Sequence, residues 1–309
     1  MPFWSEFGGH AWTVWPRVRD RLRPPAAPAS EAWRAEVRDP ALGIVKLTGR
    51  IDHVPDARGL VVILHGMGGS AERAYCAAAA SAARSAGLSS LRLNLRGADG
   101  SGEDLYHIGL VDDVDAAIAH SDVARYSRLY ALGFSLGGHI ALRLGALEGG
   151  SGRLRAVAAV CAPLDLEASC AYIDHPARWA YRRHLLAGVK EVYRKVAARR
   201  PMPASIETVL AIRTVRSWDE RVVAPRFGFS GASDYYRKVA VAPRLAEMEL
   251  PTLIVASESD PMIPAHTVRR VLVRASDAVE TRWLKRGGHV GFPGEYALLS
   301  EIMDWLVKT

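Results

Sequence analysis

Cysteine is scarce in this sequence, and its scarcity argues against two kinds of stabilising site. The 309 residues contain three cysteines, Cys76, Cys161 and Cys170, and none of them forms a CxxC pair. An odd number without regular spacing argues against a disulfide framework and against a zinc site. Cys161 falls in an apolar, strand-like run, so we expect it to be a small core residue.

The sequence also lacks long hydrophobic runs. Residues 1–6 have neither the basic start nor the continuous apolar segment of a secretory signal. No run approaches the roughly 20 apolar residues that span a bilayer. We therefore expect a soluble, cytoplasmic chain, with export by a route that needs no signal as the open alternative.

Motifs for binding nucleotides or nucleic acids are missing as well. The phosphate-binding pattern G-x-x-x-x-G-K-[ST] does not occur, so we expect no nucleotide site. The formal net charge is +7, but the basic residues are spread along the chain and no nucleic-acid motif accompanies them. The charge therefore indicates general use of arginine on the surface, and we expect no nucleic-acid partner.

What the sequence does contain is the alternating pattern of an α/β protein with a large core. Hydrophobic residues make up 49% of the chain and charged residues 24%, as in ordinary globular proteins. Short apolar runs alternate with helical patterns, which predicts parallel βαβ units and an open sheet covered on both faces. The expected strands are 44–47, 60–64, 91–95, 129–132, 154–160, 251–256 and 280–284.

The alternation stops between residues 164 and 249, where only helical patterns such as 179–199 occur. Because the strands resume afterwards, this stretch is predicted to be a helical insertion over the strand ends rather than a separate domain. We accordingly divide the chain into an N-terminal arm at 1–33, an α/β core at 34–163 and 250–309, and a cap insertion at 164–249.

The N-terminal arm interleaves aromatic and basic residues, and a proline-rich connector at 24–28 follows it. Two interpretations remain open. The arm packs back onto the domain, which we favour, or it contacts a membrane interface or a partner. The residues concerned are Phe3, Trp4, Phe7, Trp12, Trp15 and Trp33, with Arg17, Arg19, Arg21 and Arg23.

A G-x-S-x-G sequence at residues 133–137 lies where the apolar run 129–132 gives way to a helical pattern. A sharp strand-to-helix turn exposes a serine hydroxyl, and the flanking glycines permit a close approach that larger side chains would block. The spacing therefore predicts that Ser135 is a nucleophile.

Three other strand ends carry residues that suit a serine nucleophile. A glycine loop with His65 and Met67 follows 60–64, Asp260 follows 251–256, and His289 follows 280–284. Because chemistry in open α/β sheets collects at the carboxyl ends of the strands, we expect these residues to meet. His289 would accept the Ser135 proton, Asp260 would orient the imidazole, and the N–H groups of Met67 and Leu136 would stabilise an oxyanion.

Some nearby residues have competing interpretations. Asp165 follows the strand 154–160 and is a rival to Asp260 as the acid. His65 is predicted to organise the glycine loop rather than to act as a base. Asp112, Asp113 and Asp115 are interpreted as solvated or capping residues at the start of a helix.

These residues resemble the α/β-hydrolase superfamily, and within it the YheT-like branch of esterases, over about residues 9 to 309. Two short segments depart from the branch. The dipeptide at 11–12 differs from its usual Leu-Gln, and 51–55 matches its acidic turn weakly. The matching segments are Gly9-His10, residues 13–16, 65–70, 94–97, 106–109, 133–138, Phe227-Gly228-Phe229, Tyr235-Tyr236-Arg237, Asp260-Pro261 and 287–292.

The resemblance implies an α/β-hydrolase fold, with a mostly parallel central sheet, helices on both faces and a helical cap. It also implies Ser135, Asp260 and His289 as the triad, and short- to medium-chain acyl esters or lipids as substrates. We expect no metal and no organic cofactor. An acyltransferase and a non-catalytic relative that binds a ligand or partner remain as alternatives, whereas serine at the elbow disfavours epoxide and haloalkane hydrolysis.

Overall fold

The computed structural model describes residues 3–22, 27–147 and 152–309. For some residues of helix α1 (Phe3–Leu22) only the backbone is described. The expectations for the side chains of Phe3, Trp4, Phe7, Arg17, Arg21 and Arg23, and for Pro24 and Pro25, therefore lie outside the described part of the chain.

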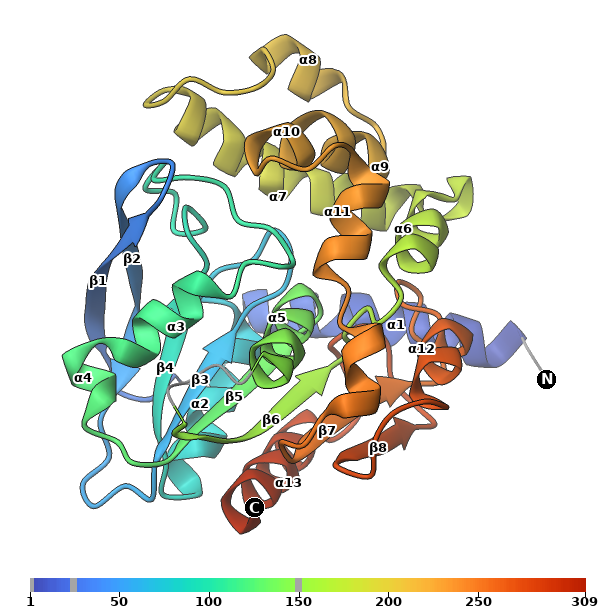
Figure 1. Ribbon diagram of the computed structural model, residues 1–309. Helices are drawn as coiled ribbons and strands as arrows, with labels where there is room; N and C mark the ends of the chain where they lie inside the picture. The colour runs from blue at the N-terminus through green and yellow to red at the C-terminus, as the bar shows by residue number, and fades with distance from the viewer. Residues whose placement is uncertain (1–2, 23–26, 148–151) are drawn as a thin grey trace.

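A mixed eight-stranded sheet forms the centre of the molecule, in the order β1-β2-β4-β3-β5-β6-β7-β8 (Figure 1). The pairs β1–β2 and β2–β4 are antiparallel, and every later pairing is parallel. The strands are β1 (Glu31–Asp39), β2 (Gly43–Asp52), β3 (Leu60–Leu64), β4 (Ser89–Asn94), β5 (Leu129–Phe134), β6 (Leu154–Val160), β7 (Thr252–Ser257) and β8 (Val279–Leu284).

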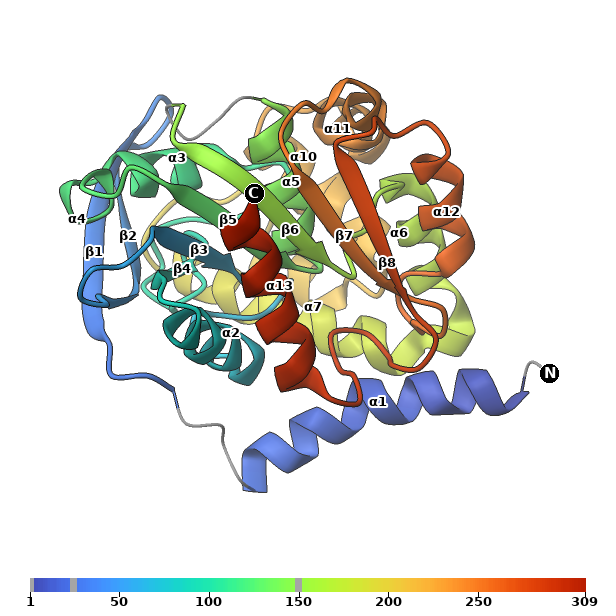
Figure 2. The same cartoon turned by 90° about the horizontal axis from the view of Figure 1, so that it is seen from below.

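Both faces of the sheet are buried, which confirms the expected α/β-hydrolase architecture. In β3, Val62 and Leu64 belong to one core cluster while Val61 and Ile63 belong to the other, because successive side chains of a strand point to opposite faces. Helices α2 (Ala74–Ser85) and α13 (Glu295–Lys308) cover one face (Figure 2). The other face is covered by α3 (Asp112–Ala119) and α5 (Leu136–Ala146), with α4 (Ser121–Ala124) and α12 (Ala265–Leu272) beside them.

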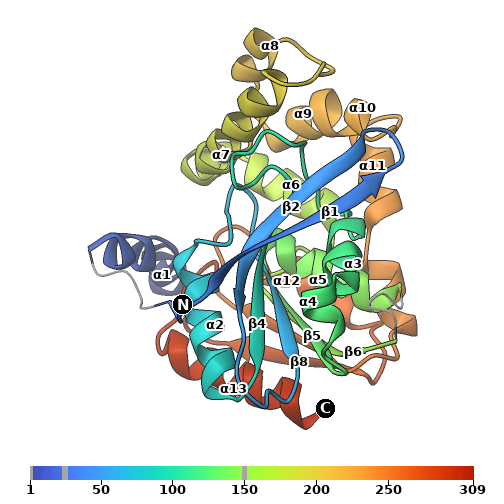
Figure 3. The same cartoon turned by 90° about the vertical axis from the view of Figure 1, so that its left-hand side faces the viewer.

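The strand β1 is not among the strands expected from the sequence. Trp33, which the sequence groups with the N-terminal arm, lies in this strand and is only 2% exposed. Residues 31–39 alternate buried and exposed positions and pair with β2 over their whole length. The resulting hairpin lies in front of the rest of the sheet in Figure 3 and reaches toward the helices that follow β6.

Residues 164–249, called the inserted segment below, run from β6 to β7 and contain helices but no strand. Buried side chains of this segment, such as Tyr193, Trp218 and Val222, join the core cluster on one face of the sheet. The helices are α6 (Leu166–Asp174), η1 (Pro176–Arg178), α7 (Trp179–Ala197), α8 (Ile206–Ala211), α9 (Val215–Trp218), the π-helix η2 (Asp219–Val223), α10 (Ala224–Arg226), α11 (Ala232–Val239) and η3 (Ala242–Glu247).

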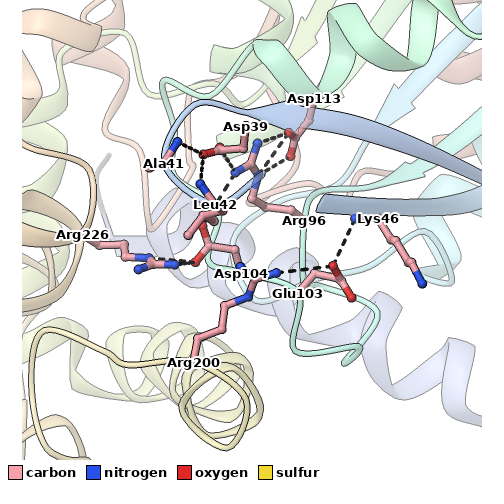
Figure 4. Close-up of polar contacts among 10 residues, drawn as sticks. All are labelled: Asp39, Ala41, Leu42, Lys46, Arg96, Glu103, Asp104, Asp113, Arg200 and Arg226. Carbon is pink, nitrogen blue, oxygen red and sulfur yellow. Dashed lines mark hydrogen bonds and ion pairs between the residues drawn. The ribbon is translucent and has the colours of Figure 1, made fainter. Parts of the chain in front are cut away.

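A buried ion cluster around Arg96 joins the hairpin to the core (Figure 4). The Arg96 guanidinium donates to both oxygens of Asp113, through Nε at 2.9 and 3.1 Å and through Nη2 at 2.5 Å, and to Asp39 through Nη1 at 2.6 Å. Burial alone would lower the pKa of Arg96, but hydrogen bonds and charge from these carboxylates raise it instead. The interpretation of Asp113 as a solvated or capping residue is wrong, because this side chain is fully buried against Arg96.

The same cluster connects the core to the inserted segment. Asp104 lies 3.7 Å from Arg96 Nη1 and accepts a hydrogen bond of 2.9 Å from Arg226 Nε, on α10. Its neighbour Glu103 accepts the backbone N–H of Lys46 and pairs with Arg200, beyond α7. Two consecutive acidic residues after β4 therefore bridge the sheet to the inserted helices (Figure 4).

We predict that Arg96→Met destabilises the protein by about 3–5 kcal/mol, because it leaves buried carboxylates without their cation. Unfolding in urea, followed by far-UV circular dichroism, measures the change. Arg282→Met is the control, since it breaks a surface ion pair with Glu301 in which both side chains are nearly half exposed, and it should cost at most about 1 kcal/mol. Equal losses in the two variants would contradict a structural role for the cluster.

Candidate active site

Ser135 occupies a strained turn between β5 and α5. Its backbone adopts φ 53° and ψ −117°, a conformation that a serine rarely takes. The turn is so tight that a Cβ on Gly133 would lie 2.0 Å from the carbonyl oxygen of Gly137, and one on Gly137 would lie 2.5 Å from that of Leu64. The two flanking glycines are therefore required by close backbone contact.

The structure brings Ser135, His289 and Asp260 together from three strand ends. His289 Nε2 lies 2.9 Å from Ser135 Oγ, and His289 Nδ1 lies 2.8 Å from Asp260 Oδ2. A carboxylate can only accept hydrogen bonds, so Nδ1 carries the imidazole proton and Nε2 is left to accept the serine proton. His289 and Asp260 are both buried, which shields the hydrogen bond between them from water.

Asp260, rather than Asp165, is the carboxylate that contacts His289. The other oxygen of Asp260 accepts backbone N–H groups from Met262 and Ile263 at 2.8 and 3.0 Å, which hold the carboxylate in place. Asp165 instead caps α6 through the N–H of Ala168 and pairs with Arg270. The rival interpretation of Asp165 therefore has no support in this geometry.

The glycine loop after β3 is held by the side chains of His65 and Tyr106. The buried His65 ring contacts the carbonyl of Gly66 at 2.8 Å and accepts the N–H of Leu95 at 3.2 Å. Burial lowers the pKa of His65 to about 4, so the ring is neutral and serves to organise the loop. Tyr106 accepts the N–H of Gly68 at 2.7 Å. Within the described residues no hydrogen bond reaches the N–H of Met67 or of Leu136.

The helix α1 supports the histidine, and sequence reasoning missed this role. Thr13 Oγ1 accepts the backbone N–H of His289 at 2.8 Å while donating to Gly9. A Cβ on Gly288 would lie 2.3 Å from the Gly9 carbonyl oxygen, and one on Gly9 would lie 1.8 Å from that of Ser259. The family resemblance at Gly9 and Thr13 was the available signal. Their partners lie far away in the chain, however, and Thr13 and His289 are 276 residues apart.

Two cavities of different character meet at Ser135 and His289. The first, called the apolar cavity, extends under the inserted segment between residues such as Leu185, Val189 and Trp218. The second, called the polar cavity, opens beside α1 and the glycine loop. Its lining includes Thr13, Asp20, Glu72, Arg73, Tyr75, Arg92, His184 and Glu295.

Potential metal ligands gather at one place in the described part of the chain. Cys161, Asp260 and His289 each offer an atom within 4.8 Å of the others. Asp260 and His289 are already bonded to each other, and burial raises the pKa of the Cys161 thiol well above its usual value, which disfavours the thiolate that metals require. All three cysteines are buried and free.

Comparison with known proteins places this geometry in a family. The model of the alpha/beta hydrolase family matches residues 61–297. The Escherichia coli (strain K12) protein "Putative esterase YheT" is 30% identical over 264 residues, which cover 80% of this chain and 76% of that protein. The chain belongs to the α/β-hydrolase family, in its YheT-like branch.

Other similar proteins agree with this membership. Human "Phospholipase ABHD3" is 24% identical over a match that covers 81% of this chain and 63% of that protein. Yeast "Monoacylglycerol lipase" is 25% identical over a match that covers 67% of this chain and 49% of that protein. The solved esterase Pf2001 from Pyrococcus furiosus superposes with a TM-score of 0.59 at 16% identity, covering 90% of this chain and 93% of that one. That structural likeness supports the fold alone.

We predict that Thr13→Val lowers the kcat of this hydrolase roughly 10- to 100-fold on a nitrophenyl ester, with a smaller change in KM. The valine leaves the buried N–H of His289 without an acceptor, and a misplaced catalytic group is costly to the rate. Thr13→Ser keeps the hydroxyl and should retain most of the activity. Equal kcat values for the two variants would contradict the assigned contact.

Proposed function

We propose that this α/β hydrolase is a serine hydrolase of carboxylic esters that works through an acyl-enzyme. The observation that carries the proposal is the continuous hydrogen-bonded path from Ser135 Oγ through His289 to Asp260, at the junction of two cavities. The names of the esterase, phospholipase and lipase relatives support ester or lipid substrates.

In the first half-reaction Ser135 Oγ attacks the ester carbonyl carbon and its proton passes to His289 Nε2. Asp260 stabilises the imidazolium that forms. The carbonyl oxygen becomes an oxyanion facing the N–H groups of Met67 and Leu136, whose lack of partners among the described residues supports this role. The tetrahedral intermediate expels the alcohol, which takes the proton from His289.

In the second half-reaction water takes the place of the alcohol. His289 accepts a proton from the water as its oxygen attacks the acyl carbon, and the proton returns to Ser135 Oγ when the acid leaves. An alcohol in place of water would give acyl transfer by the same steps. Hydrolysis and transfer therefore differ only in the second nucleophile.

We assign the acyl chain to the apolar cavity and the alcohol to the polar cavity. Apolar side chains such as Leu185 and Val189 match a hydrocarbon chain, while Arg73 and Tyr75 match a polar alcohol group. In this proposal the inserted segment acts as the cap, since many of the residues that line the apolar cavity belong to it.

We predict that Ser135→Ala reduces the hydrolysis of 4-nitrophenyl octanoate to background, a loss of roughly 10⁶-fold in kcat, because it removes the hydroxyl that attacks the ester and leaves His289 without a serine proton to accept. Ser300→Ala, at an exposed position on α13, should keep wild-type activity. A fluorophosphonate should add its mass to Ser135 in the wild type and leave the Ser135→Ala protein unmodified.

The same assay separates the alternatives. Formation of ethyl octanoate in the presence of ethanol, in place of octanoic acid, would identify acyl transfer. A wild-type protein that neither turns over esters of any chain length nor reacts with the fluorophosphonate would favour a non-catalytic relative.

We also propose that α1 rests on a lipid surface. Val14, Trp15, Val18 and Leu22 are 48%, 55%, 44% and 76% exposed, and Val14, Val18 and Leu22 recur at intervals of four along one helix. The helix lies along the outside of the molecule in Figure 2, and its Thr13 and Pro16 line the polar cavity. No helix among the described residues is long and apolar enough to cross a membrane.

Flotation with vesicles of phosphatidylcholine and phosphatidylglycerol tests this contact. The double variant Trp15→Ser/Leu22→Ser should bind at least about tenfold more weakly, because it removes two large apolar side chains from the interface. Leu210→Ser removes an exposed leucine from α8 and should leave binding unchanged. Equal binding by all three proteins, or none by the wild type, would reject the lipid surface as the partner of α1.

A further inference from the structure

Besides Ser135 and His289, the wall of the apolar cavity carries polar residues that lie outside the proposed triad. Ser169 lies on α6, Asp219 begins the π-helix η2, and Tyr236 lies on α11. All three are buried and come from the inserted segment. A purely hydrocarbon acyl chain would pack best against a wall made only of apolar side chains, because it cannot form hydrogen bonds with buried polar groups. The three polar residues therefore require an explanation.

Ser169 is a buried hydroxyl without a partner. Its side chain is 6% exposed, and within the described residues its Oγ atom makes no hydrogen bond. A buried polar atom left unpaired costs about 1–3 kcal/mol, so such an atom in a native protein requires an explanation, for example an ordered water or a bound group. The side chain lines the cavity. Because Oγ itself has almost no accessible surface, a molecule in the cavity reaches it only once the hydroxyl turns toward the cavity by rotation about the Cα–Cβ bond.

Asp219 has spare acceptor capacity in the same cavity. Tyr236 donates to Asp219 Oδ2 at 2.6 Å, and no hydrogen bond reaches Oδ1 in the described part of the structure. The residue is positioned by a π-helix, an irregularity that occurs frequently at functional sites. The cavity wall therefore offers a donor at Ser169 and an acceptor at Asp219.

We propose that this part of the apolar cavity recognises a hydroxyl group on the acyl chain, so that the preferred substrates are esters of hydroxylated medium-chain acids. The substrate hydroxyl donates to Asp219 and accepts from Ser169, while the rest of the chain lies against the apolar side chains. This inference rests on the proposed ester hydrolysis, because it assigns the acyl chain to the apolar cavity.

A hydroxyl fits better than a charged group. Burial, aided by the charge of Asp174, raises the pKa of the Asp219 carboxyl to about 7, so near neutral pH this group is only partly ionised. A positively charged group on the acyl chain would require a fully ionised Asp219 carboxylate. A negatively charged group would be repelled by the ionised form of the same carboxyl. A neutral hydroxyl both donates and accepts, which matches either protonation state of the carboxyl and the rotating hydroxyl of Ser169.

The test compares 4-nitrophenyl octanoate with a series of 4-nitrophenyl hydroxyoctanoates that carry the hydroxyl at successive carbons from C4 to C8. In the wild type, at least one hydroxylated ester should exceed octanoate in kcat/KM by about tenfold. Ser169→Ala and Asp219→Asn should each reduce that preference at least about fivefold, measured as the ratio of the two kcat/KM values within each variant. Ser205→Ala, on the inserted segment outside both cavities, should keep the wild-type preference.

A binding measurement separates this proposal from the proposed reaction. Calorimetry on Ser135→Ala protein compares octanamide with the hydroxyoctanamides, which need no catalysis. Tighter binding of a hydroxylated amide, lost in the Ser169→Ala background, supports the hydroxyl site even if no ester is hydrolysed. If all amides bind equally and all esters have equal kcat/KM values, the proposed hydroxyl site is wrong. Water would then be the group that contacts the polar residues of the cavity wall. If Asp219→Asn fails to fold in a thermal melt, the Ser169→Ala result alone decides.

Discussion

The arrangement of the hairpin, the sheet and the inserted segment depends on the ion pairs that the buried guanidinium of Arg96 makes. A buried cation is tolerated only where carboxylates surround it, and here those carboxylates come from the hairpin, from the loop after β4 and from α3. Through Asp104 the cluster extends to Arg226 of the inserted segment, and two residues further along the same loop Tyr106 holds the glycine loop. One charge therefore links the sheet, the loop beside Ser135 and the helices above the apolar cavity.

The candidate site is built by backbone contacts between segments that are distant in the chain. Ser135 keeps its strained turn because Gly137 packs against the end of β3, and His289 keeps its position because α1 packs against Gly288. Such contacts give the side chains little freedom before any substrate binds. A site whose groups are already held in place can stabilise the charge that develops during a reaction without first having to rearrange. The N-terminal helix is thus part of the support of the site as well as an exposed surface.

The fold and most of the candidate site residues could be predicted from local sequence patterns. Apolar runs mark the strands β3 and β5, and the run in β6 is interrupted only by Arg155, because a strand buried on both faces needs apolar side chains at nearly every position. The positions of Ser135, Asp260 and His289 after the ends of β5, β7 and β8 then predicted that the three would meet at one edge of the sheet. The strand β1 escaped prediction because its polar, half-exposed pattern resembles the arm before it.

The sequence by itself determined most of the strands of the sheet, the points where they end and the residues that follow those ends, because these features depend only on local periodicity and chain order. The tertiary structure alone decided which carboxylate contacts His289, that Asp113 is buried against Arg96, and that Thr13 supports the histidine. It also decided that Ser169 and Asp219 share the wall of the apolar cavity. Each of these depends on a contact between residues far apart in the chain, and no local pattern encodes the partner of a side chain whose position is set by packing.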